Sequence, residues 1–364
     1  MERTLVGRTV DELDTPVLIV NLDALEQNIE GIAAAVAVRG VAWRPHVKVH
    51  KTPAIAHRQM EAGAIGVACA KLGEAEVLAD AGIRDIMVAN QIVGPIKTRR
   101  LAALCRHADV IVAVDDPRNV AELDAVAREY GVQPRVVIEV DIGMGRCGVR
   151  PGSAAVALAQ TVAACEGLRF SGLMAWEGQA MSVVDNETRP TVITNAVGEL
   201  VATADACREA GLPVEIVSCS GTGTYLVAAA IPGVTEVQAG GGIFGDPVYR
   251  RMGVPLEPAL SLIAQVISRP TPTRVVFDFG RKEIDPSMAP PIPVGVNGVE
   301  TMALHIEHCI LELADPAETP ALGERVAFDV GFGDRAIHLH EYLYGVRYGI
   351  VETVWHVAAR GHHQ

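Results

Sequence analysis

The chain has 364 residues, of which 49% are hydrophobic and 21% are charged. This length allows a large core and is sufficient for two domains. Lys and Arg number 31 and Asp and Glu 44, so the formal charge is −13, which argues against a nucleic-acid or anionic-membrane partner. The N-terminal segment MERTLVGRTVDELDTP lacks the apolar run of a signal peptide, and no later segment approaches the roughly 20 apolar residues of a membrane span.

The seven cysteines indicate the compartment. They are odd in number, scattered, and mostly flanked by apolar or small residues, without the spacing of a zinc site. Reduced thiols in the core are therefore expected, and with them a cytoplasmic location.

Apolar β-rich runs alternate with amphipathic segments along much of the chain, after a first helix expected at Leu22–Val38. Strands are expected at Ala42–Val49, Gly66–Ala70, Asp85–Asn90, Asp109–Val114, Arg135–Asp141, Phe170–Trp176, Glu215–Ser220 and Thr235–Gly240. Helices are expected between them at Pro53–Ala62, Gly73–Ala81, Pro95–Arg106, Pro117–Tyr130, Ser153–Cys165 and Thr191–Ala210. Eight strand-and-helix units predict a parallel (β/α)8 TIM barrel.

The pattern changes near residue 262. Further β runs, without long helices, follow at Thr273–Phe277, Thr301–Ile306, Cys309–Leu313, Arg325–Asp329 and Leu343–Val357. The sequence thus predicts an α/β protein with a barrel over residues 12–262 and an all-β domain over residues 263–364, to which residues 1–11 are also assigned.

The segment RPHVKVHKTP, which follows Trp43, is the most informative stretch of the chain. In an extended strand, alternation puts Arg44, His46, Lys48 and His50 on one face. Burying these basic groups requires partners, which predicts a bound anionic group, and a Schiff-base lysine fits the position of Lys48. From spacing alone, a structural lysine paired with an acidic residue at the end of the fifth strand remains an alternative.

Three glycine-rich loops follow other strands of the expected barrel. The fifth strand ends in EVDIGMGRCG, the seventh in SCSGTGTY and the eighth in QAGGG. Barrel enzymes place their chemistry at these strand ends, and the loops after strands seven and eight commonly bind phosphate. A phosphate site together with a lysine describes pyridoxal 5′-phosphate (PLP). A tight strand-to-helix connection, or a barrel binding a phosphorylated metabolite without PLP, is the alternative.

The motifs ELDTPVLIVNLDALEQNI, RPHVKVHKTP, EVDIGMGRCGV, AWEG, SGTGTY, HIEH and YLYGVRYGIVETVWHVAARG occur in this order. In this order they resemble the D-threonine aldolase and D-serine dehydratase family, PLP enzymes with an alanine-racemase-like barrel and a C-terminal β domain. The resemblance runs from about Glu12 to Gly361, nearly the whole chain.

The resemblance implies a set of site residues. Lys48 is the lysine that binds the cofactor, and Arg146 lies near the PLP ring. The other cofactor-binding residues are expected to be Trp176, Ser220, Gly221, Thr222, Gly223, Thr224, Gln238, Gly240 and Gly241. His50, His46 and His308 are candidate bases for the substrate hydroxyl, although packed or hydrogen-bonded histidines are the alternative. Trp176 stands where the family commonly has a tyrosine, and its indole N–H donates but cannot accept.

The C-terminal region departs from the family pattern at a metal site. The family usually has a His-x-Asp or His-x-Cys pair there, and alignment places Phe332 and Asp334 on that pair, so the first ligand is absent. Asp334 with His338, or with His308, is the candidate set for a divalent ion such as Mn²⁺ or Mg²⁺. Histidines that line an interface are the alternative.

The function implied is that of a PLP-dependent lyase, which cleaves a small D-configured β-hydroxy amino acid by a retro-aldol reaction to glycine and an aldehyde. Dehydration of D-serine or a related hydroxy acid is the nearest alternative. Racemisation is a further one, with Tyr342 and Tyr344 as candidate second bases, and a non-catalytic PLP carrier is disfavoured by the extra β domain. The resemblance also implies a homodimer with a small-molecule amino-acid substrate.

Overall fold

The computed structural model describes residues 2–317 and 319–364, which form two compact units. The barrel unit comprises Glu30–Lys48, Pro53–Gly240 and Gly361–Gln364. The β unit comprises Met1–Ile29, Val49–Thr52 and Gly241–Arg360. In the described residues, no helix has the length and apolar character needed to cross a membrane.

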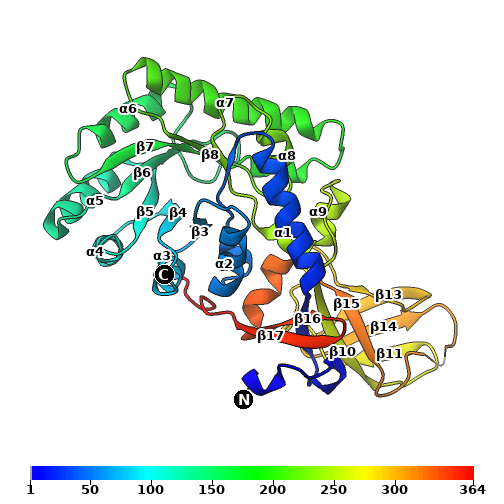
Figure 1. Cartoon of the computed structure of the whole chain (residues 1–364). Coiled ribbons are helices and arrows are strands. Elements are labelled where there is room, and N and C mark those ends of the chain that lie inside the picture. The colour runs from blue at the N-terminus through cyan, green and yellow to red at the C-terminus, as the bar shows by residue number, and fades with distance from the viewer. Residues whose placement is uncertain (1, 318) are drawn as a thin grey trace. The chain divides into compact units, whose positions relative to one another are not determined.

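Eight parallel strands form the sheet of the barrel unit, in the order β2-β9-β8-β7-β6-β5-β4-β3 (Figure 1). The strands are β2 (Ala42–Trp43), β3 (Val67–Cys69), β4 (Asp85–Gln91), β5 (Asp109–Val114), β6 (Arg135–Glu139), β7 (Arg169–Met174), β8 (Ile216–Cys219) and β9 (Glu236–Val237). A parallel bridge between His46 and Ala68 joins the chain after β2 to β3, so the sheet curls back on itself. The predicted (β/α)8 barrel is confirmed, and each of the eight strands overlaps its predicted range, although several are shorter than predicted.

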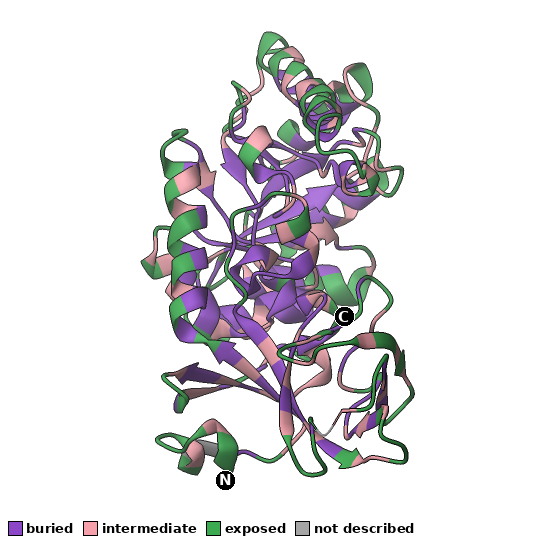
Figure 2. Cartoon of the chain, turned by 90° about the vertical axis from the view of Figure 1, so that its right-hand side faces the viewer, coloured by how far each residue is buried: buried purple, intermediate pink, exposed green. Residues whose placement is uncertain are grey.

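Helices alternate with these strands, as the sequence predicts. They are α1 (Leu22–Ala37), α2 (Pro53–Glu61), α3 (Leu72–Asp80), α4 (Pro95–Leu104), α5 (Pro117–Tyr130), α6 (Ser153–Ala163), α7 (Arg189–Glu209) and α8 (Tyr225–Ala228), with 3-10 turns η3 (Val47–Val49) and η4 (Gly178–Ser182). Figure 2 shows that the strands are mostly buried, whereas the helices carry both buried and exposed residues. This division is typical of helices that cover a sheet with one face.

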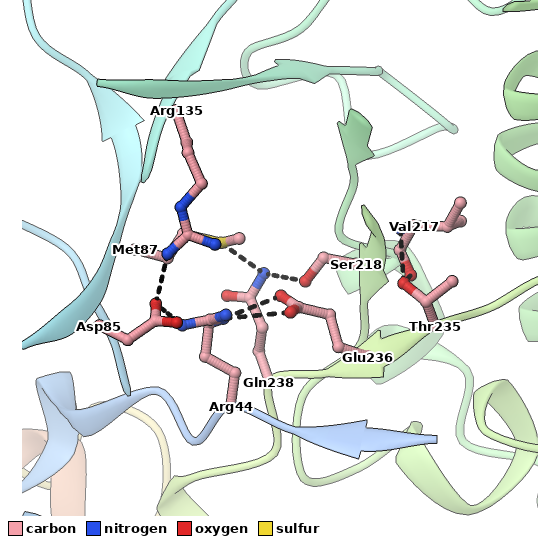
Figure 3. Close-up of polar contacts among 9 residues, drawn as sticks. All are labelled: Arg44, Asp85, Met87, Arg135, Val217, Ser218, Thr235, Glu236 and Gln238. Atoms are coloured by element: carbon pink, nitrogen blue, oxygen red, sulfur yellow. Dashed lines mark hydrogen bonds and ion pairs between the residues drawn. The ribbon is translucent and has the colours of Figure 1, made fainter. Parts of the chain in front are cut away.

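A network of charged side chains lies inside the barrel (Figure 3). Arg44 is 1% exposed, and its guanidinium contacts Glu236 at 3.1 Å and Asp85 at 2.6 Å. Arg135 contacts Asp85 at 2.8 Å and also pairs with Asp109. Burial by itself lowers the pKa of Arg44, but the charges of Glu236 and Asp85 outweigh burial and raise it. The expectation that Arg44 helps to hold a bound anion is therefore wrong, because the protein's own carboxylates neutralise it.

The β unit is built on strands from both ends of the chain. They are β1 (Val17–Asn21), β10 (Leu260–Ser268), β11 (Arg274–Phe277), β12 (Ile292–Pro293), β13 (Val299–Leu304), β14 (Cys309–Leu313), β15 (Arg325–Asp329), β16 (Tyr342–Arg347) and β17 (Ile350–His356). The sheet order is β13-β14-β11-β10-β1-β16-β17, with β15 paired to both β10 and β12. Short helical elements complete the unit: η1 (Glu2–Leu5), η2 (Val10–Glu12), η5 (Gly241–Phe244), α9 (Pro247–Arg251), η6 (Gly333–Arg335) and η7 (Ile337–Leu339).

Three phenylalanines fix the core of the β unit. Phe277, Phe279 and Phe328 are fully buried, and their ring centroids lie 4.7 to 6.5 Å apart in tilted or edge-to-face arrangements. The run predicted at Leu343–Val357 is a hairpin, β16 and β17, whose turn uses positive φ at Tyr348 and Gly349. Strand β1, which lies in the motif ELDTPVLIVNLDALEQNI but was not predicted as a strand, pairs antiparallel with β10 and parallel with β16.

Candidate functional site

Lys48 lies on the 3-10 turn η3 rather than on a strand. Pro45 lacks an N–H group and ends the extended run. The N–H groups of Arg44 and His46 still donate to the carbonyl oxygens of Val237, in β9, and of Gln238, directly after it. The expectation that residues 44 to 50 alternate along one strand face is therefore wrong. The Lys48 side chain is exposed, and its Nζ lies 5.7 Å from the centroid of the Trp176 ring.

Arg146 reaches the same ring from another loop. Its guanidinium carbon lies 5.4 Å from the Trp176 ring centroid, so the ring lies close to two cations. Nη2 of Arg146 also lies 3.5 Å from Oε1 of Glu139, at the end of β6. Burial raises the pKa of Glu139, and Gln91 and Arg146 offset part of that rise. Trp176 thus brings together the lysine and the arginine that the sequence predicted.

The loop that carries Arg146 is shaped by Asp141. Its Oδ1 accepts the N–H groups of Gly143 and Gly145, at 3.0 Å each, and both glycines have positive φ. A carboxylate that bonds its own backbone two and four residues on is a typical turn device, and glycine adopts the required φ at little cost. Gly143 and Gly145 of the motif EVDIGMGRCG therefore fix the loop that positions Arg146.

The turn after β8 contains the predicted phosphate loop. Ser220 has φ of 70°, which is rare for a residue with a side chain, and its Oγ is buried with no hydrogen-bond partner among the described residues. Gly221 and Thr224 bond to each other, Gly221 N–H to Oγ1. A carbon added at Gly221 would lie 3.3 Å from Nε1 of Trp176, so the indole nitrogen lies beside this turn.

The other residues predicted to bind the cofactor lie in or directly after the turns that follow β8 and β9. Gln238 is 5% exposed, and its amide donates to Oγ of Ser218 at 2.9 Å (Figure 3). A carbon added at Gly240 would lie 2.2 Å from the carbonyl oxygen of His46, so this glycine allows the chain after β9 to approach the chain after β2. Gly241 begins η5 in the β unit, and Thr222 and Gly223 lie in the turn with Ser220.

The candidate histidines differ in burial. His46 is half-buried and its Nδ1 accepts the N–H of Lys48 at 3.4 Å. His50 is fully buried, its Nδ1 accepts the N–H of Thr52, and its ring lies 6.3 Å from that of Phe244. His308 is exposed in the turn between β13 and β14.

The two candidate metal ligands belong to consecutive 3-10 turns, η6 and η7. Nδ1 of His338 lies 3.1 Å from the main-chain oxygen of Asp334, so this ring nitrogen already has a hydrogen bond. Among residues 2–317 and 319–364, no three His, Cys, Asp or Glu side chains gather as a metal site requires. The donor set therefore does not fit a divalent metal with protein ligands alone.

Two family models match successive parts of the chain. Residues 20–247 match the alanine racemase N-terminal domain, and residues 259–346 match the putative serine dehydratase domain. The chain belongs to the alanine racemase N-terminal domain family. The family's enzymes include PLP-dependent aldolases and dehydratases, so the resemblance predicted from the motifs is confirmed.

Two relatives that match nearly the whole chain are named as aldolases. D-threonine aldolase from Arthrobacter sp. is 36% identical over 98% of this chain and 95% of its own. A 3-hydroxy-D-aspartate aldolase from Paracoccus denitrificans (strain Pd 1222) is 34% identical, again over 98% of this chain and 95% of its own. The crystal structure of D-threonine aldolase from Filomicrobium marinum superposes with a TM-score of 0.95 and 37% identity, covering 98% of each chain.

The described residues fit PLP. The buried hydroxyl of Ser220 has no partner among the described residues, and it lies in a turn with positive φ, which suits a phosphate. Lys48 and Arg146 near Trp176 suit the aldehyde and the ring of the cofactor. Glu177 belongs to the AWEG motif but was not among the predicted site residues. Its carboxyl is fully buried and accepts the N–H of Ser220 at 3.3 Å. An acid directly after an apolar strand was the signal available.

Proposed function

We propose that this protein is a PLP-dependent lyase, which cleaves small D-configured β-hydroxy amino acids by a retro-aldol reaction to glycine and an aldehyde. The observation that carries the proposal is the grouping of Lys48 and Arg146 around Trp176, with its indole beside the Ser220 turn. The aldolase activity named for the Arthrobacter and Paracoccus relatives supports the reaction type.

In this proposal Lys48 binds the cofactor aldehyde covalently, and the Ser220–Thr224 turn receives the phosphate. When bound, PLP supplies the electron-withdrawing ring that makes the Cα–Cβ bond breakable. Arg146, held by Glu139, fixes the ring orientation. Lys48 would hold the cofactor, and its amine would supply the proton that Cα needs once the Cα–Cβ bond has broken.

A base must also take the proton of the β-hydroxyl. We assign this role to His46, because it lies two residues from Lys48, belongs to the same unit and is half-buried. His50 is packed at 0% exposure, and His308 is exposed in a hairpin turn of the β unit. Among the described residues, Asp334 and His338 do not form a metal site with protein ligands alone, so no step is assigned to a metal.

Product analysis tests the reaction. The purified protein is incubated with D-threonine, D-serine and D-alanine, with and without Mn²⁺, and the products are identified by mass spectrometry. Glycine and acetaldehyde from D-threonine are expected. A 2-oxo acid with ammonia would move the protein to the dehydratase alternative, and an inverted enantiomer would move it to the racemase alternative.

Absorbance tests the cofactor lysine separately. The wild-type protein is expected to be yellow, and Lys48→Ala is expected to lose the yellow band while retaining its circular dichroism. Lys51→Ala is a matched control, since Lys51 is also near the turn but is assigned no role. An unchanged band in Lys48→Ala contradicts the assignment.

We also propose that the protein is a cytoplasmic homodimer. The scattered cysteines support the compartment, and all seven are free in the structure. The dimer rests on the family resemblance. Light scattering at micromolar concentration checks it, and a monomer mass contradicts it.

A further inference from the structure

Glu177 is a buried acid that the proposed reaction does not use. It follows Trp176 after strand β7, and its side chain is 0% exposed. Oε2 accepts the N–H of Ser220 at 3.3 Å. Oε1 is buried and has no hydrogen-bond partner among the described residues. A buried carboxyl with one unused oxygen needs an explanation, because such groups are rare and costly.

The neighbouring Ser220 is unusual in the same two respects. Its φ of 70° is unfavourable for a residue with a side chain, and its Oγ is also buried without a partner in the described structure. The hydrogen bond from Ser220 N–H to Oε2 of Glu177 joins the two residues that carry these unsatisfied atoms. Strained backbone and unsatisfied polar atoms together are a recurrent mark of a site shaped for a ligand. A phosphate oxygen would accept a hydrogen bond from the unpartnered Ser220 hydroxyl.

Charge decides which form of Glu177 suits that ligand. An ionised carboxylate beside a phosphate repels it, and no basic side chain forms an ion pair with Glu177 among the residues described. The facing groups are the Ser220 amide, the Thr224 hydroxyl and, at the end of β8, the buried thiol of Cys219. Burial raises the pKa of Cys219, so this thiol stays neutral. Lys48 and Arg146 lie instead over the ring of Trp176.

Burial also raises the pKa of the Glu177 carboxyl above its ordinary range, while the Thr224 hydroxyl and the Ser220 amide offset part of the rise. The direction agrees with the geometry, since a neutral acid can still accept the Ser220 N–H through Oε2. The raised pKa also favours the protonated carboxyl group, which carries no charge.

We propose that Glu177 is a positioning residue for the phosphate turn, which is present as the neutral acid when an anionic cofactor is bound. The proposal rests on the proposed function, because the anion is taken to be the phosphate of PLP. Binding of the anion favours the protonated form. Cofactor affinity therefore falls as the pH rises through the titration of Glu177 in the free protein, since each binding event must then take up a proton from solvent.

Pyridoxamine 5′-phosphate is the probe, because it carries the ring and phosphate of PLP but no aldehyde, so Lys48 chemistry does not enter. Its dissociation constant is measured by calorimetry from about pH 6.5 to about pH 9 for the wild type and for Glu177→Gln, a neutral side chain of the same shape. Glu74→Gln is the matched control. Glu74 is also buried and also accepts a backbone N–H, that of Ala70, next to a different strand.

The expected result is that the wild type and Glu177→Gln bind equally at the acidic end. At the basic end the wild type is expected to bind about fivefold more weakly than Glu177→Gln or worse. Titration of the probe itself cancels in this ratio. Glu74→Gln should follow the wild type throughout.

Two outcomes overturn the proposal. Parallel curves for the wild type and Glu177→Gln, on both sides of the pH at which Glu177 titrates in the free protein, would show that the protonation state of Glu177 does not affect binding. A uniform loss of more than about tenfold in Glu177→Gln would show that the turn requires the ionised carboxylate. In either case a yellow wild-type protein leaves the proposed function intact, whereas a colourless protein that binds neither PLP nor the probe removes the proposed function itself.

Discussion

Replacing Arg44 by methionine tests the charged network inside the barrel. The side chains of Arg44 and Glu236 are 2% and 4% exposed, so the substitution leaves the Glu236 carboxylate buried without its ion-pair partner. Asp85 is affected less, because it is 32% exposed and keeps Arg135 at 2.8 Å. Breaking one buried pair in this way costs about 3–5 kcal/mol of the free energy of unfolding.

The assay is urea unfolding followed by circular dichroism, on Arg44→Met, Glu236→Leu and the double variant. The double variant removes both charges, so we expect it to unfold within about 1–2 kcal/mol of the wild type. Arg8→Met is the matched control. Arg8 pairs with Glu12 at 2.8 Å, but both side chains are largely exposed, and we expect a change of less than about 0.5 kcal/mol.

Two results would refute the reasoning. If Arg44→Met loses less than about 1 kcal/mol, the network does not stabilise the barrel as its burial implies. If the double variant is no more stable than the single one, the loss comes from the packing of the Arg44 stem and not from an unpaired carboxylate. Affinity for PLP in Arg44→Met should stay within about twofold under native conditions, because its partners Asp85 and Glu236 begin strands β4 and β9 whereas barrel sites form where strands end.

Three further predictions concern the site. Ser220→Gly should raise the free energy of unfolding by about 1 kcal/mol, because glycine relieves the unfavourable positive φ. It should also weaken PLP binding, because the hydroxyl is lost. Urea unfolding and absorbance titration measure the two effects, and unchanged PLP binding would show that the turn does not hold the ligand. Gly240→Ala should lower both stability and PLP content, since the new carbon would lie 2.2 Å from the His46 carbonyl oxygen; normal PLP content would contradict this. EDTA should leave the rate of D-threonine cleavage within about twofold, because no third donor side chain of the described residues joins Asp334 and His338; a loss of rate that Mn²⁺ restores would contradict this.

Local patterns were sufficient to predict the barrel, because each strand-and-helix unit is contiguous in sequence. Strand Asp109–Val114 and helix Pro117–Tyr130 have the predicted ends, and Asp116 caps the helix by accepting the N–H of Arg118. The strand predicted at Ala42–Val49 ends early at Trp43, where Pro45 interrupts it and η3 follows.

Long-range contacts limited the prediction of the site. Lys48 and Arg146 were found from motifs, but nothing local shows that Arg44 is neutralised by Glu236, 192 residues later in the chain. Glu177 was passed over for the same reason, since its contact with Ser220 joins two loops that are 43 residues apart. Alternation also failed at residues 44 to 50, because the period of a strand applies only while the backbone stays extended.

Strand β1 has a consequence for how the protein folds. It lies between β10 and β16, and its residues Ile19, Val20 and Asn21 pair with Tyr344, Gly345 and Val346. Strand β1 therefore has no neighbour on one side until β16, far later in the chain, has been synthesised. Pairing over such a sequence separation is slow, because a long loop must close first. We expect the barrel unit to become resistant to protease early in synthesis and the β unit to acquire that resistance only after β16 has left the ribosome.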